Sequence, residues 1–143
     1  MNDDQALLDA VERVLLPQGT ELPSLEEPER VFVRVWQLEV EVQNGGLDQY
    51  YFNSAGDHAV QAPAALRAIG ADRTALIVER ANALFPSSAP PADRGARQAL
   101  LLDHVPDDAF DEPTDAFDAS PDALVVLLAA YVRAHAADIR GAQ

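Results

Sequence analysis

The chain has 143 residues, of which 48% are hydrophobic, 24 acidic and 10 basic, so its formal net charge is −14. This length predicts a single domain over residues 1–143, with enough apolar material for a buried core. The absence of cysteine excludes disulfides and zinc–thiolate sites. The charge argues against direct binding to nucleic acid or to a membrane surface, because both need cationic side chains.

Two explanations of the acidity stay open at this stage. A strongly negative protein attracts basic partners. Every basic residue is an arginine, however, and the chain is rich in alanine, aspartate and proline, which is also typical of a GC-rich genome. The acidic N-terminus lacks the positive charge of a signal peptide, and the longest apolar run, 123–132, is too short to span a bilayer. We therefore expect a cytoplasmic protein.

The first half of the chain reads as helices separated by glycine and proline. A helix is predicted over 3–16, ended by Pro17 and followed by a loop to residue 27. Residues 31–42 fit either a strand or a helix, and the start signal at Pro28 favours a helix. Gly45 and Gly46 should end that helix, because glycine readily takes the left-handed conformation found at helix ends.

A short helix should follow the two glycines over 47–54, and Asp57 is expected to cap the next one, which Pro63 kinks or restarts. Asp72 should cap a further helix, and another is expected over 93–104.

The last helix is predicted to begin at Ser120 as its cap, with Pro121 and Asp122 in its first turn. Residues 123–132 are apolar on every face, which predicts that this helix is the central, most buried one. Nothing argues strongly for a sheet. The fold class is therefore all-α, a bundle of six or seven helices.

No catalytic constellation is evident. The three histidines lie far apart, so no pair has the spacing of metal ligands, and the serines read as turn or cap residues. We expect a non-enzymatic protein without metal or cofactor. The alternative is a small-ligand or enzyme site formed by polar side chains around the glycines: Gln49, Tyr50, Asn53 and His58.

Residues 105–120 differ from the rest of the chain. Pro113 and Pro121 preclude one continuous helix across them, while Phe110 and Phe117 would attach the segment to the core. If 107–112 is helical, the carboxylates recur on one face at i, i+3 and i+4 spacing and could resemble a row of phosphates. The expected partner-binding residues are therefore Asp107, Asp108, Asp111, Glu112, Asp115 and Asp118.

Residues 37–56 contain the sequence Asn-Gly-Gly-Leu-Asp-Gln-Tyr-Tyr-Phe-Asn at 44–53, and Ala-Ile-Gly-Ala follows at 68–71. This pattern resembles the signature of the bacterial DNA-mimic-protein-like family, Asn-Gly-Gly-Phe-x-Gln-Tyr/Phe-Phe-x-Asn with a later Ile-Gly-Ala. The resemblance covers 28–85, and Leu47 stands where the family has its first phenylalanine.

The resemblance implies an all-helical fold and, for the family's named member, an acidic surface that imitates DNA and occupies the DNA-binding face of a repressor. The signature itself transfers no binding residue. Our leading hypothesis is a protein that binds a basic partner, such as a DNA-binding regulator, by imitating phosphate charge. The alternative within the binding class is an immunity-type protein that neutralises a basic toxin.

Overall fold

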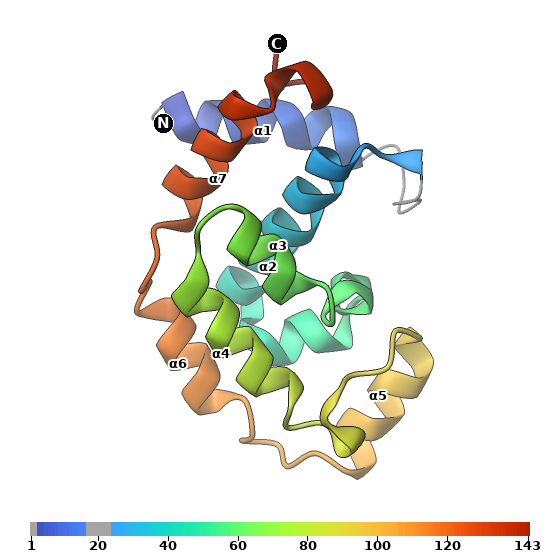
Figure 1. Cartoon of the computed structure of the whole chain (residues 1–143). Helices are drawn as coiled ribbons and strands as arrows, with labels where there is room; N and C mark the ends of the chain where they lie inside the picture. Colours follow the sequence, from blue (N-terminus) through green and yellow to red (C-terminus); the bar gives the residue numbers. More distant parts are fainter. Residues whose placement is uncertain (1–2, 17–23) are drawn as a thin grey trace.

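The computed structural model describes residues 3–16 and 24–143, which form seven α-helices and, within those ranges, no strand (Figure 1). The all-α prediction is confirmed. Pro17 and most of the loop expected after it lie outside the described residues. The helices are α1 (Asp3–Leu15), α2 (Glu27–Phe52), α3 (Ala62–Ala68), α4 (Asp72–Asn82), α5 (Arg94–Asp103), α6 (Asp111–Asp118) and α7 (Leu124–Ala134), with short 3₁₀ turns η3 (Ser54–His58), η4 (Pro86–Ser88) and η5 (Ala136–Asp138).

Helix α2 is the centre of the molecule. It contacts α1, α3, α5, α6, α7 and the η3 turn. Phe32, Leu38 and Tyr51 along its length are completely shielded from solvent, and apolar side chains from several helices surround them. The helical interpretation of residues 31–42 is therefore correct, and the mixed periodicity arises because neighbours cover α2 on more than one side.

The prediction that the last helix is central is wrong. Helix α7 packs mainly on α1 at one end of the molecule (Figure 1). It buries Leu128, Ala129 and Val132, but Val126 on the opposite face is 55% exposed. An apolar sequence sets how much surface a helix can bury, whereas the number of neighbours sets how much it does bury.

The expected cap of the last helix is also wrong. Helix α7 begins at Leu124 with Ala123 as its N-cap, and Ser120 lies before it with a positive φ of 53°. The Asp122 carboxylate instead accepts hydrogen bonds from the backbone N–H of Thr74 (2.8 Å) and from its hydroxyl (3.0 Å). Asp122 thus satisfies the start of α4, the role that the sequence assigned to Asp72.

The glycine pair breaks α2 as predicted. Gly45 and Gly46 have non-helical backbone angles, and Gly46 has a φ of 77°, in the region that favours glycine. The break leaves the backbone N–H of Leu47 without a helical partner, and it donates to the Thr114 hydroxyl of α6 at 3.1 Å. A Cβ on Gly46 would lie 3.1 Å from the Thr114 methyl group, so the kink and α6 are fitted to each other.

The segment after the kink is held by Arg97 of α5, whose side chain is completely buried. A guanidinium has five N–H donors, and all five are used here. The acceptors are the backbone carbonyls of Tyr51 (2.6 Å), Pro91 (3.0 Å), Ala92 (3.1 Å) and Asn53 (2.8 Å), and the carboxylate of Asp57 (2.9 Å).

Asp57 is therefore an ion-pair partner and not the helix cap that the sequence suggested, since α3 starts later, after Gln61. Its neighbour Gly56 is required by packing. A Cβ at that position would lie 2.7 Å from the Tyr50 carbonyl oxygen and 2.9 Å from Arg97 Nε. The close approach of backbone to guanidinium thus excludes any larger residue.

Glu29 joins the start of α2 to the C-terminal segment. Its buried carboxylate accepts from the backbone N–H of Glu26 (3.0 Å) and from the backbone N–H (3.0 Å) and Nε (2.9 Å) of Arg140. Burial opposes ionisation, but the hydrogen bonds from Arg140 outweigh it and lower the pKa of Glu29. The pair contributes stability that is lost as the pH falls through that lowered value.

Replacing Arg97 by lysine tests the role of this side chain. Lysine keeps the charge but has three donors, so at least two buried acceptors lose their hydrogen bonds. We expect the free energy of unfolding, measured with urea, to fall by about 3 kcal/mol. Arg80→Lys, at an exposed position, is the matched control and should change it by less than about 0.5 kcal/mol. Equal effects of the two substitutions would contradict this role.

Candidate functional site: the acidic surface of α6

All six carboxylates of the acidic segment lie on the exterior. Each of these residues is exposed, and none forms an ion pair with any residue that the structure describes. Asp107 and Asp108 lie in the turn before α6, and the other four belong to the helix. The segment is therefore a negative surface without internal compensation.

The helix begins later than the sequence suggested. Residues 107–110 form turns, so Asp108 does not share a helical face with Asp111. Pro113 does not separate two helices but lies in the first turn of α6, where a missing N–H costs little. Within α6 the stripe at i, i+4 and i+7 is formed by Asp111, Asp115 and Asp118.

The opposite side of α6 is fixed to the core. Phe110 and Phe117 are 1% and 3% exposed, as the sequence predicted, and Thr114 between them accepts the hydrogen bond from Leu47. The Phe110 ring packs at a centroid distance of 4.8 Å on Tyr51 and 5.7 Å on Phe85. The carboxylates thus project from a rigidly seated helix.

The kink in α2 adds a carboxylate that the sequence reading missed. Asp48 is the second residue after the two glycines and lies near Asp107 and Asp111 of the acidic segment. Partial burial, together with the charges of Asp111 and Asp107, raises the pKa of Asp48. These residues are about 60 positions apart in the chain, and the hydrogen bond from Leu47 to Thr114 joins the kink to α6.

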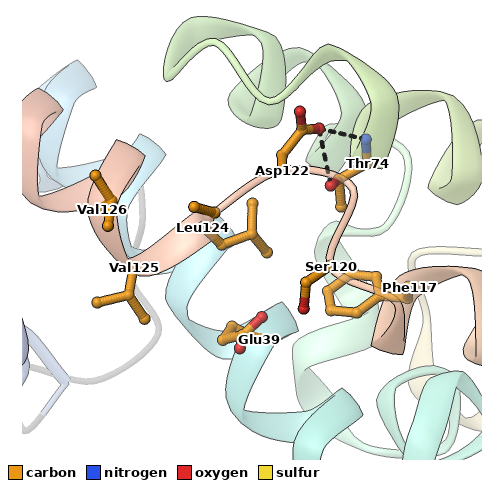
Figure 2. Close-up of a pocket in the computed structure, with 9 residues that line it drawn as sticks. Glu39, Thr74, Phe117, Ser120, Asp122, Leu124, Val125 and Val126 are labelled. Atoms are coloured by element: carbon orange, nitrogen blue, oxygen red, sulfur yellow. Dashed lines mark hydrogen bonds between the residues drawn. The ribbon is translucent and has the colours of Figure 1, made fainter.

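A second contribution comes from Glu39 at the other end of α6. Burial, partly offset by a hydrogen bond from Gln43, and the charge of Asp118 raise the pKa of Glu39. Glu39, Phe117, Ser120 and Leu124 line a hollow of about 290 Å³. Figure 2 shows these side chains around the hollow. The acidic surface therefore extends from Asp48 along α6 to Glu39.

Comparison with known families shows which family the chain belongs to. A family model described as DMP19-like protein matches residues 23–135, which is most of the chain. The chain belongs to this family. Comparisons with curated proteins and with solved structures find no match.

The DMP19-like signature is explained by the fold. Gly46 makes the kink, and the side chains of Gln49 and Asn53 donate to the same oxygen of Glu41 at 2.7 and 3.0 Å. Gly56, three residues after the signature, admits Arg97. The signature residues thus shape the kinked helix and the turn after it. Asp48 occupies a variable position of the signature, whereas the six carboxylates of residues 107–118 lie outside it, on and just before a helix that the kinked helix positions.

The alternative site at Gln49, Tyr50, Asn53 and His58 is not assembled as one polar cleft. Gln49 and Asn53 are engaged by Glu41, and Tyr50 is 1% exposed in the core. Burial and the nearby charge of Arg34 lower the pKa of His58, so this half-buried imidazole is neutral at pH 7. The side chains of Gln49 and Asn53 thus hold the segment after the helix break to Glu41, and the buried Tyr50 hydroxyl has no hydrogen-bond partner among the described residues.

Residues 3–16 and 24–143 contain no group of three or more histidine, cysteine, aspartate or glutamate side chains placed to hold a metal ion. None of their helices combines the length and apolar character needed to cross a membrane.

Replacing Asp48 by asparagine tests the charge crowding at the kink. A raised carboxyl pKa means that the folded protein holds this proton more tightly than the unfolded chain. The ionised group therefore destabilises the fold above the folded pKa, and the penalty disappears as the pH falls toward the unfolded value. At pH 7.5 we expect D48N to raise the free energy of unfolding by roughly 0.5 kcal/mol, with a smaller gain near pH 4.

The matched control is Asp103→Asn, at an exposed position at the end of α5. Urea unfolding of both variants at the two pH values makes the comparison. A D48N protein that is less stable than the wild type at pH 7.5, or a gain that grows on acidification, would contradict the crowding.

Proposed function

We propose that this DMP19-like protein is an acidic binding protein of the DNA-mimic type. Its surface on α6, extended by Asp48, would occupy the basic DNA-binding face of a partner protein such as a transcriptional regulator. The observation that carries the proposal is the set of six exposed carboxylates, which have no ion-pair partner among the described residues. Membership of the DMP19-like family supports it.

The spacing of the charges supports the same proposal. Side chains at i, i+3 and i+4 on a helix have Cβ atoms about 5–6 Å apart, so Asp111, Asp115 and Asp118 form a row of anions on one face. Phosphates along one DNA strand repeat every ~3.4 Å of helix axis, which is a comparable density of charge. Arginine and lysine side chains that bind phosphates bind carboxylates through the same charge-assisted hydrogen bonds.

Rigidity separates this surface from an ordinary acidic loop. Phe110, Thr114 and Phe117 attach α6 to the core, so binding would not have to order the segment. An interface whose backbone is already ordered loses less conformational entropy on association than a loop that must first be ordered. A loop that is acidic only because of genomic composition has no need of such anchoring.

Affinity capture from cells that naturally contain the protein tests the proposal, followed by elution with duplex DNA. The test variant is the triple substitution Asp108→Asn, Glu112→Gln and Asp115→Asn. We expect the wild type to retain a basic DNA-binding protein that duplex DNA displaces and that high salt releases. We expect the triple variant to bind the same protein at least about tenfold more weakly, since three charge contacts of about 0.5 kcal/mol each are lost.

The control variant removes three exposed carboxylates elsewhere, Asp3→Asn, Asp103→Asn and Asp138→Asn, and so has the same net charge. Equal loss of binding in both variants would mean that total charge and not this surface is recognised. Capture of a basic toxin that DNA does not displace would favour the immunity-type alternative.

A further inference from the structure

A groove runs beside the acidic surface, between α4 and α6, which lie side by side (Figure 1). Its volume is about 280 Å³. One wall consists of Ile77, Arg80 and Leu84, and the other is formed mainly by Glu112, Pro113 and Ala116 of α6. The volume of the groove is below the usual range of small-molecule pockets, but it is large enough for one or two aliphatic side chains.

The groove has apolar side chains on the α4 wall and an acidic residue, Glu112, on the α6 wall. Leu84 is 45% exposed and Ile77 is half-buried, so apolar surface faces solvent. Glu112 lines the groove itself, and Asp108 and Asp115 lie on the same segment. On the α4 wall the cation is Arg80, which makes the two edges electrically different.

We propose that this groove receives an aliphatic side chain from a basic segment of the partner protein, whose lysines or arginines lie against the α6 carboxylates. The inference rests on the proposed function and adds to it. Charge imitation alone gives attraction to any basic surface, whereas an apolar anchor beside the charges selects a segment that carries both features.

Charge complementarity decides between possible occupants. A second copy docked here across a two-fold axis would bring its own α6 carboxylates toward the first set, and like charges repel. An anionic lipid surface would be repelled for the same reason. A basic segment instead gains both from the α6 edge and from burial of its aliphatic side chain.

Two synthetic helical peptides are the probes. Both have the same lysines, and one has leucines at i, i+4 and i+7 where the other has serines. We expect the wild-type protein to bind the leucine peptide about fivefold more tightly than the serine peptide, since partial burial of a leucine is worth about 1 kcal/mol. In the Leu84→Ser variant this ratio should fall to about one, while the salt dependence of binding is unchanged.

Leu102→Ser is the matched control, because Leu102 is a 75% exposed leucine on α5, away from the groove. It should leave the peptide ratio unchanged, and circular dichroism verifies that both variants are folded. A ratio that survives Leu84→Ser, or that falls equally with Leu102→Ser, overturns the groove proposal. If capture from cells still depends on the α6 carboxylates in that case, the proposed function stands and only the groove proposal fails.

Discussion

The buried guanidinium of Arg97 is the interaction on which the rest of the structure depends. Its five hydrogen bonds go to four backbone carbonyls and one carboxylate, which belong to the end of α2, to the turn after it and to the loop before α5. A buried cation is tolerated only when its donors are satisfied, so these segments must meet in one arrangement. Gly56 follows from the same constraint, because a side chain there would collide with Arg97.

The arrangement of segments around Arg97 also positions α6, the acidic helix. The residues just before the turn form the kinked end of α2, where Leu47 donates to Thr114 and the Tyr51 ring packs on Phe110. Helix α6 is therefore positioned by the glycine-rich signature, although its carboxylates are not part of it. In this chain, the fold signature and the carboxylates of α6 therefore lie on separate elements.

Local patterns in the sequence were sufficient for most helices, for the break at Gly45 and Gly46 and for the burial of Phe110 and Phe117. The predictions that failed concern side chains whose hydrogen-bond partners lie far away in the sequence. Asp57 and Asp122 look like caps for the helices that follow them, but a guanidinium 40 positions away and the start of α4 are their partners. For the same reason, the sequence did not reveal that Asp48 and Glu39 lie beside the acidic segment. It also led to the wrong prediction that α7 is the central helix, whereas α2 contacts more elements.

The central claim is that the kink brings Asp48 and the α6 carboxylates into one charged surface. The most direct measurement is the pKa of the Asp48 carboxyl, followed by NMR titration in the wild type, in Asp111→Asn and in Asp103→Asn. We predict a pKa above the ordinary 3.8 in the wild type, a decrease in Asp111→Asn and no change in Asp103→Asn. An Asp48 pKa that is ordinary, or that does not respond to Asp111→Asn, would show that the carboxylates do not form a common surface.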